Sequence, residues 1–269
     1  MMGQGPAPFL ELQGVTKRYP NGTLALTDIS LAVGAGEFLA IVGASGCGKS
    51  TILRHVAGLV APTAGRITWS QPPAAGGIGP GGIGMVFQEP TLMPWARIRD
   101  NVRLPLDLAK VPRAEADARV TALLAQVGLA DFAQAYPREL SGGMKMRASI
   151  ARALVTRPRL LLMDEPFAAL DEITRQKLND DLLALWREQR FTAMFVTHSV
   201  YEGVYLANRA IVMAPRPGRI HADIPLDLPY PRDEALRTDA RYATACRAVS
   251  LALAEAMRPP GRPSGETAA

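Results

Sequence analysis

The chain has 269 residues, of which 48% are hydrophobic and 20% charged, a composition that suits one large or two modest globular domains. No apolar run is long enough to cross a bilayer, and the N-terminus, MMGQGPAPFLEL, lacks the basic start and long apolar segment of a signal peptide. The net charge of +5 comes without a long Lys/Arg block or interleaved aromatic residues, so it predicts a solvated surface rather than a nucleic-acid platform.

The first part of the chain alternates apolar and polar residues in short runs over residues 9–42, which predicts strands joined by tight turns. Residues 49–57 predict a helix, and residues 66–88 predict a strand, a Gly/Pro-rich loop and a second strand. Residues 99–155 have a helical pattern. From residue 159 the two patterns alternate, with strands expected over 159–166, 191–198 and 209–214 and helices over 172–189 and 201–207.

Strands that alternate with helices predict an α/β fold with a mostly parallel sheet covered by helices. The helix-rich middle, about 89–157, interrupts this alternation and is predicted to form a subdomain. The main domain is expected to span 9–224, followed by a C-terminal extension over 225–269 that contains a helix. Both ends, 1–8 and the stretch from Arg258 on, are rich in Pro, Gly and small residues and are expected to be disordered tails.

The strongest chemical signal is a phosphate-binding loop. Residues 43–50 match the pattern G-x-x-x-x-G-K-S, follow the apolar strand FLAIV and open a helix. In such a loop the backbone N–H groups wrap phosphates, the lysine reaches the β and γ phosphates, and the hydroxyl holds Mg²⁺. A Gly-rich turn before a helix is the alternative, but strand, lysine and hydroxyl are all in place. The predicted nucleotide contacts are Gly43, Ala44, Ser45, Gly46, Cys47, Gly48, Lys49, Ser50 and Thr51.

Cys47 occupies a free position in this loop, and we assign it no role of its own beyond thiol reactivity. The second cysteine, Cys246, falls in a late helix-like segment. No set of Cys and His residues has the spacing of a zinc site, so we expect two unpaired thiols in a reducing compartment.

Two adjacent carboxylates end the apolar strand LLLM. Asp164, at the carboxyl end of the strand, is placed to bind Mg²⁺ through water, and Glu165 is placed to polarise the water that attacks the γ-phosphate. An acidic pair that merely caps a helix is the alternative, and the upstream P-loop makes it the weaker one. Gln88 and His198 also follow strands, so we expect them at the same edge of the sheet, although each alone is unremarkable.

The stretch LSGGM, residues 140–144, precedes a helical pattern. A serine and two glycines at a helix N-terminus offer free backbone N–H groups and a favourable dipole to an anion. The chain would thus have a second phosphate-binding site besides its P-loop.

At this point the sequence resembles the ATP-binding-cassette (ABC) ATPases, from about Phe9 to Ile220. The resemblance rests on an ordered set of motifs, namely Tyr19, GASGCGKST, Gln88, LSGGM, LLLMDEP, AALD (residues 168–171) and His198. It implies a P-loop NTPase core with a mostly parallel sheet, an antiparallel β subdomain and a helical subdomain, with ATP and Mg²⁺ as ligands.

The resemblance also accounts for the second phosphate-binding site. In this family two ATPase domains pair head to tail, and each ATP lies between the P-loop of one copy and the LSGG of the other. It implies that Ser141, Gly142 and Gly143 hold the partner's γ-phosphate and that Asp171 contacts the facing subunit. It further implies that Tyr19 stacks on adenine, that Gln88 joins Ser50 and Asp164 at Mg²⁺ and senses the membrane partner, and that His198 holds the γ-phosphate.

Two departures from the family pattern are Met144, where glutamine is usual, and Ala168, where serine or glycine is common. The methionine is typical of importers of nitrate, sulfonates, taurine and thiamine precursors, and FQEPTLMPWARIRDNV, FAALDEITR and MAPRPGRI resemble the same subgroup. Leu92, Met93 and Trp95 are expected either to be exposed and to receive a short helix of the membrane partner, or to belong to the core of the helical subdomain.

The resemblance implies the ATP-hydrolysing subunit of a bacterial importer at the cytoplasmic face of the inner membrane. Its partners would be a second copy of itself, a transmembrane permease and, indirectly, a solute-binding protein. One alternative is a soluble ABC ATPase acting on DNA or ribosomes, but the chain has neither a long coiled-coil insertion nor two fused cassettes. An exporter ATPase is another. The cargo stays open among nitrate, a sulfonate, taurine, bicarbonate and a pyrimidine.

Overall fold

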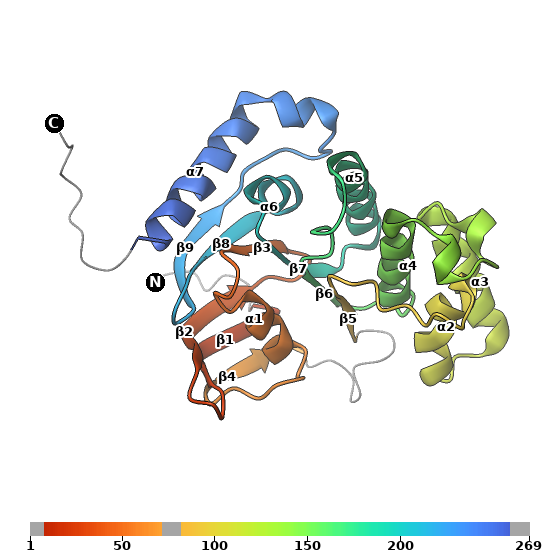
Figure 1. Cartoon of the computed structure of the whole chain (residues 1–269), viewed down its shortest axis with the longest axis horizontal. Coiled ribbons are helices and arrows are strands. Elements are labelled where there is room, and N and C mark those ends of the chain that lie inside the picture. The colour runs from red at the N-terminus through yellow and green to blue at the C-terminus, as the bar shows by residue number, and fades with distance from the viewer. Residues whose placement is uncertain (1–7, 72–81, 259–269) are drawn as a thin grey trace.

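The computed structural model describes residues 8–71 and 82–258 (Figure 1). Both expected tails, apart from Pro8 and Arg258, and most of the Gly/Pro-rich loop lie outside these residues. None of the helices within the described ranges is both long and apolar enough to cross a membrane.

A six-stranded sheet forms the centre of the molecule, in the order β5-β6-β7-β3-β8-β9. The strands are parallel except for β9, which pairs antiparallel with β8 at the edge. This arrangement confirms the predicted α/β class with a mostly parallel sheet. The strands are β3 (Phe38–Gly43), β5 (Ile83–Val86), β6 (Leu160–Asp164), β7 (Thr192–Thr197), β8 (Arg209–Ala214) and β9 (Arg219–Pro225).

A second, antiparallel sheet of three strands lies beside the P-loop end of the molecule, in the order β2-β1-β4 (Figure 1). Its strands are β1 (Leu10–Arg18), β2 (Leu24–Val33) and β4 (Ala64–Trp69). The β1–β2 connection is a tight turn in which Gly22 has a φ of 83°, as the Asn-Gly pair predicts. This sheet is the antiparallel β part that the resemblance implied.

Helices cover both faces of the large sheet, and β3 shows why its sequence is apolar throughout. Phe38 and Ala40 pack in one core with the helical part of the chain, whereas Leu39 and Ile41 pack in a second core against the antiparallel sheet. A strand buried on both faces loses the usual alternation of apolar and polar residues. Helices that contact the strands of the large sheet include α1 (Lys49–Val56) and α6 (Val200–Leu206), and α5 (Glu172–Gln189) packs on α6.

The middle of the chain forms a helical group at one side of the molecule (Figure 1). It consists of α2 (Ile98–Leu108), α3 (Arg113–Gln126) and α4 (Gly142–Leu154), with short 3₁₀ turns at Ala130–Phe132 and Pro137–Glu139. Ser141 begins α4 as its N-cap, because its hydroxyl accepts a hydrogen bond from the N–H of Met144. The exact limits of this group, 89–157, stay a prediction.

The C-terminal segment folds back over α6 and the edge of the large sheet. After β9 it forms a 3₁₀ turn (Glu234–Thr238) and α7 (Ala240–Ala256), so the expected helix is present. Arg232 is buried and its Nη1 donates to the carbonyls of Val204, Tyr205 and Ala207, at 3.2, 2.6 and 3.0 Å. These bonds satisfy carbonyls at the end of α6, so this part of the extension is integral to the domain.

Candidate functional site

A cleft of about 970 Å³ opens where the strands of the large sheet end. Carboxyl ends of parallel strands are where ligands bind in such folds, because the loops that follow them converge there. The P-loop and α1, the end of β6, Gln88, the start of β2 and the loop after β8 all contribute to its lining. The cleft therefore brings together residues that the sequence places far apart.

The P-loop turns from β3 into α1 at Gly48, the residue that begins the helix. Gly48 has a φ of 97°, and a Cβ there would lie 2.5 Å from Cδ2 of Leu26. Only glycine fits this combination of backbone conformation and close approach. Of the predicted nucleotide contacts in the loop, Ser45, Gly46, Gly48, Lys49, Ser50 and Thr51 line the cleft, whereas Gly43, Ala44 and Cys47 do not.

Lys49 is almost fully buried and has three oxygen partners. Its Nζ donates to the carbonyls of Gly43 and Ala44, at 2.8 and 3.1 Å, and lies 3.3 Å from Oε1 of Glu165. The ammonium is thus held at the base of the loop, where phosphate oxygens can replace these partners.

Ser50 and Asp164 meet at the end of β6. The Ser50 hydroxyl donates to Oδ1 of Asp164 at 2.8 Å, and Gln88 lines the same cleft. Burial raises the pKa of Asp164 above its ordinary value, against the hydrogen bond from Ser50. Hydroxyl, carboxylate and amide oxygens are the ligands that Mg²⁺ prefers, and it completes its shell with phosphate and water. The donor set therefore fits Mg²⁺ bound with a nucleotide, whereas the described residues contain no group of three or more His, Cys, Asp or Glu placed to hold a metal ion by themselves.

Glu165 faces Lys49 with one oxygen and His198 with the other. Its Oε2 lies 2.9 Å from Nδ1 of His198, and its backbone N–H donates to the carbonyl of Val196 in β7. Burial alone would raise the pKa of Glu165, but the bond to His198 and the charge of Lys49 outweigh it and lower the pKa. The carboxylate is therefore charged at neutral pH, as a general base must be.

Glu165 also has a backbone φ of 47°, an uncommon value for a residue other than glycine. Such conformations persist where the surrounding structure holds them, and they cluster at functional sites. His198 stands at the carboxyl end of β7 with its ring half-exposed, and it does not itself line the cleft but contacts Glu165, which does.

Cys47 behaves differently from the rest of the loop. Its side chain is fully buried, and burial raises the pKa of its thiol above the ordinary value. Buried thiols that stay protonated are inert, so the thiol reactivity considered from the sequence is not supported. Both cysteines are free and buried, as expected.

The LSGG stretch lies outside this cleft. None of Ser141, Gly142 and Gly143 lines it, and Ser141 and Gly142 are exposed at the start of α4. A Cβ on Gly143 would lie 2.6 Å from Cγ2 of Thr174, so α4 packs closely on the first turn of α5. Met144 is half-buried against the main core, which explains why an apolar residue is tolerated in place of glutamine.

Two further predicted residues flank these sites. Tyr19 lies at the β1–β2 turn, where its N–H donates to the carbonyl of Thr23, a residue that lines the cleft, but Tyr19 itself does not line it. Asp171 begins α5 as its N-cap and accepts a hydrogen bond from the N–H of Thr174 at 2.9 Å. The neighbouring Ile173 is exposed, as a residue at a subunit contact would be in a single chain.

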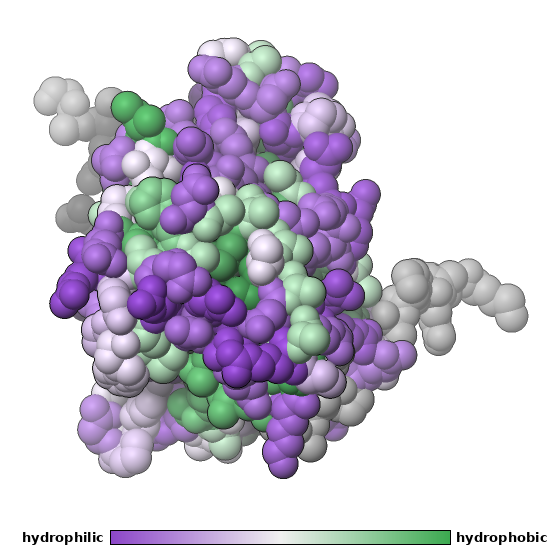
Figure 2. Space-filling model, turned by 90° about the vertical axis from the view of Figure 1, so that its right-hand side faces the viewer, coloured by the Kyte–Doolittle hydropathy of each residue, from purple (hydrophilic) through white to green (hydrophobic). Residues whose placement is uncertain are grey.

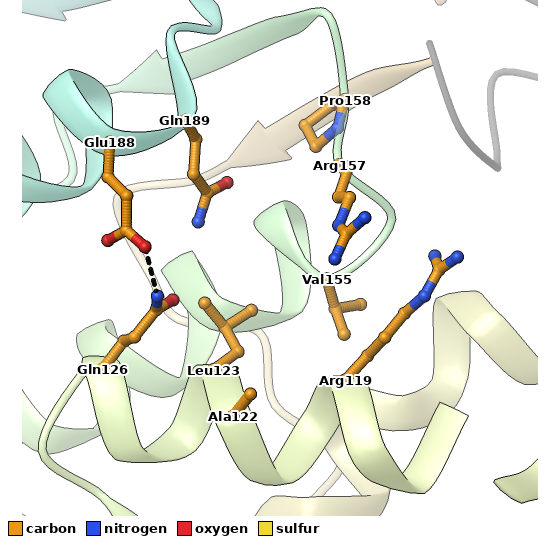
Figure 3. A pocket seen from close by; sticks show the side chains of 9 residues that line it. All are labelled: Arg119, Ala122, Leu123, Gln126, Val155, Arg157, Pro158, Glu188 and Gln189. Atoms are coloured by element: carbon orange, nitrogen blue, oxygen red, sulfur yellow. Dashed lines mark hydrogen bonds between the residues drawn. The ribbon is translucent and has the colours of Figure 1, made fainter. Parts of the chain in front are cut away.

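A second cavity, of about 350 Å³, lies between α3, the end of α4 and the end of α5 (Figure 3). Arg119 and Arg157 lie at one side of it, and Gln126 bonds Glu188 at the other, at 2.9 Å. It lacks a phosphate loop and every residue predicted to bind Mg²⁺. The cleft at the P-loop is therefore the nucleotide site.

The sequence model of the ABC transporter family matches residues 26–168, more than half of the chain. The chain belongs to the ABC transporter family. It is accordingly an ABC ATP-binding subunit and an ATPase, and the nucleotide cleft described above is its ATP site.

Three curated relatives span most of this ABC protein. An ATP-binding protein of Brucella abortus, whose name gives no substrate, is 49% identical over 237 residues, 88% of this chain and 90% of the relative. The aliphatic sulfonates import ATP-binding protein SsuB of Bacillus licheniformis is 47% identical over 211 residues, 78% of this chain and 80% of the relative. The taurine import ATP-binding protein TauB of Pseudomonas entomophila is 42% identical over 241 residues, 87% and 92% of the two chains.

Two solved structures share the fold. One is cbiO1 of Clostridium perfringens, part of the ABC transporter complex cbiONQ, with a TM-score of 0.74, 26% identity and coverage of 91% of this chain and 99% of that one. The other is a dimeric ATP-binding cassette in a post-hydrolysis state with ADP and Pi, with a TM-score of 0.71, 31% identity and coverage of 81% and 99%. Structural neighbours of this ATPase thus include a dimer and a transporter component.

Sequence reasoning missed part of the ATP cleft. Arg54 on α1 and Arg216 in the β8–β9 loop both line it, and the charge of Arg54 counteracts the raised pKa of Asp164. The loop was detectable, because Pro215 directly follows the carboxyl end of a strand parallel to β3. From the sequence alone, MAPRPGRI resembles a subgroup of the family and predicts no contact in the cleft.

Proposed function

We propose that the chain is the ATPase subunit of a bacterial importer that works as a head-to-tail pair of copies and drives a permease for a small anion. The main support for pairing of two copies is that the P-loop and the LSGG stretch, the two predicted phosphate-binding segments, lie apart in one chain. The cleft contains the P-loop, Asp164 and Glu165 but none of Ser141–Gly143, of which Ser141 and Gly142 are instead exposed at the start of α4. A second copy can supply the missing side of each site, and the dimeric structural neighbour supports this arrangement.

Within each half-site the residues divide the work of phosphoryl transfer. Lys49 and the N–H groups of the P-loop bind the phosphates, and Ser50, Asp164 and Gln88 hold Mg²⁺, which neutralises charge on the phosphate oxygens when it is bound. Glu165 orients and deprotonates the attacking water, and His198 holds Glu165 and the γ-phosphate at the open edge. The adenine lies near the β1–β2 turn, where Tyr19 stacks on it. Positioning and charge stabilisation, rather than covalent chemistry, provide the rate.

The segment after Gln88 is fixed by hydrogen bonds and leaves the side chain of Trp95 exposed, which suits contact with a partner. Asn101 is fully buried and bonds both the N–H and the carbonyl of Met93, and Arg152 donates to the carbonyls of Pro90 and Thr91. Trp95 remains 77% exposed on this fixed segment. An ordered, exposed tryptophan is a typical anchor for a protein partner.

The two alternatives that the sequence leaves open for this segment, an exposed partner contact or a buried core, hold for different residues. Leu92 packs against the main core and Met93 is half-buried, so neither is the exposed apolar contact considered above, whereas Trp95 is exposed. A groove of about 250 Å³ lies nearby between β5, α2 and α4, with Leu104, Pro105 and Leu108 in its wall. Figure 2 shows hydrophobic patches among charged side chains on this helical side of the molecule. These surfaces suit a short amphipathic helix of a permease.

A permease partner would place the ATPase at the cytoplasmic face of the inner membrane, with a solute-binding protein on the other side. The similarity to sulfonate and taurine import proteins favours a sulfonate as the cargo, because two of the relatives are named for that chemical class. The cargo would be selected by the permease and its receptor, since no residue of the ATP site needs to contact it.

The test is a mild-detergent pull-down of the tagged chain from its native cells, with bound proteins identified by mass spectrometry. We expect a multispanning membrane protein, and we expect Trp95→Ala to lose it while ATP hydrolysis by the isolated chain stays within about twofold. Leu251→Ala on α7 is the control, because Leu251 is exposed on the C-terminal helix and should not affect capture. Recovery of ribosomal or DNA-bound proteins instead would refute the importer proposal and favour the other class of ABC ATPase.

A further inference from the structure

Glu202 is a buried carboxylate that no motif predicts. It lies in the first turn of α6, only 7% exposed, and burial raises its pKa against a hydrogen bond from Thr197. Burying a carboxylate is costly unless its oxygens are bonded. Its partners therefore indicate what it does for the molecule.

Both residues that flank His198 are fixed by Glu202. Oε2 of Glu202 accepts a hydrogen bond from the hydroxyl of Thr197 at 2.6 Å, and the same hydroxyl accepts one from the N–H of Ser199 at 2.9 Å. The backbone N–H of Glu202 donates to the hydroxyl of Ser199 at 3.3 Å. These hydrogen bonds hold residues 197–199, with His198 at their centre, against the start of α6.

The other oxygen of Glu202 reaches toward α5. Oε1 lies 3.6 Å from Nε of Arg175, and Nη2 of Arg175 donates to the carbonyl of Leu170 at 2.8 Å. Leu170 immediately precedes Asp171, the N-cap of α5 and the residue implied to contact the facing subunit. The ion pair between buried Glu202 and partly exposed Arg175 thus connects the segment before α5 with the segment that carries His198.

We propose that Glu202 is a positioning residue for ATP hydrolysis, which holds His198 against Glu165 and, through Arg175, makes that position depend on the segment at Leu170–Asp171. Because the ring of His198 is half-exposed, its position relative to Glu165 depends on the backbone of 197–199 more than on packing of the ring. This inference rests on the proposed role of His198 in hydrolysis.

The test is a set of steady-state ATPase measurements on the full chain, with kcat and KM determined separately. We expect Glu202→Ala to lower kcat about tenfold or more with KM for ATP within about twofold, because a displaced general-base assembly affects chemistry rather than binding. Glu202→Gln keeps an oxygen acceptor for Thr197 but loses the charge opposite Arg175, and it should retain more activity than Glu202→Ala.

The deciding comparison is made in a His198→Ala background. If Glu202 acts through His198, removing it there should change kcat by less than about twofold, since effects of groups that act as one unit are not additive. An equal loss in both backgrounds would overturn the inference. If His198→Ala alone leaves kcat unchanged, the proposed role of His198 fails instead, and Glu202 has no such function.

Two controls separate positioning from folding. Tyr205→Phe removes a 2.6 Å hydrogen bond to Asp180 from the same helix without touching residues 197–199, and kcat should stay within about twofold. Where Glu202→Ala does not fold, Thr197→Val removes the bridging hydroxyl at nearly constant volume. It should show the same non-additivity with His198→Ala, and Thr197→Ser should restore kcat. An additive Thr197→Val loss, or no rescue by serine, would also overturn the inference.

Discussion

Lys49 Nζ lies 3.3 Å from Oε1 of Glu165, so the cation proposed to bind phosphate and the carboxylate proposed to activate water are paired with each other. A γ-phosphate that enters the cleft competes with Glu165 for this lysine. Binding of the nucleotide would then release one oxygen of Glu165 for the attacking water, which links occupancy of the site to the readiness of its base.

Lys49→Ala should abolish tight ATP binding, because the phosphates lose their buried charged partner. We expect the Kd for ATP to rise by about tenfold or more, measured by calorimetry or a fluorescent nucleotide analogue. Lys177→Ala, at an exposed position on α5, is the matched control and should bind ATP normally. Unchanged binding in Lys49→Ala would contradict the assignment of the P-loop.

Glu165→Gln should bind ATP but hydrolyse it about a hundredfold more slowly or worse, because the amide cannot accept the proton of water. The variant should also accumulate as an ATP-bound dimer in light scattering, since the step that separates the copies is slow. Glu188→Gln, outside the ATP cleft, serves as the control. A normal turnover rate in Glu165→Gln would exclude this residue as the base.

Gly143→Ala should destabilise the fold, although alanine is normally the better helix residue. The added Cβ would lie 2.6 Å from Cγ2 of Thr174, so α4 and α5 must move apart, at about 1–3 kcal/mol. Gly142→Ala meets its nearest atom at 3.4 Å and should not destabilise. Thermal unfolding of both variants and of Gly143→Ala with Thr174→Ser, which removes the methyl group, checks the argument. No recovery in the double variant would contradict it.

Asp239→Asn should reduce stability in a pH-dependent way. Asp239 begins α7 and bonds the backbone N–H and the guanidinium of Arg241, which together lower its pKa to about 2. A lowered pKa stabilises the fold above the ordinary value of about 3.9, and this contribution is lost as the pH falls toward about 2. The difference in melting temperature from the wild type should therefore be full at pH 7 and shrink at pH 3. Asp227→Asn is the control, and a constant difference would refute the linkage.

The P-loop, Asp164 and Glu165 follow strands that the sequence predicts, and they line one cleft, because consecutive residues and strand ends determine where these groups lie. The roles assigned to them stay predictions. The sequence could not show that Leu92 and Met93 are partly buried whereas Trp95 is exposed. Burial in this segment depends on Asn101, whose side chain reaches back to the Met93 backbone. The role proposed for Glu202 is not detectable in the sequence either, because the contacts of this carboxylate are with Arg175 and Thr197, which come from two other elements.

The β8–β9 loop contacts both the small antiparallel sheet and the P-loop, which lie on two sides of the ATP cleft. The N–H of Gly218 donates to the carbonyl of Ala25, the N–H of Thr27 donates to the carbonyl of Gly218, and a Cβ at Gly218 would lie only 2.2 Å from the carbonyl oxygen of Cys47. The small sheet, this loop and the P-loop are thus bonded or packed at a single point. Their amides should exchange with deuterium as one cooperative unit, slower than those of α2 and α3. In the proposed pair of copies, the helical group would then be the part that turns on closure around ATP.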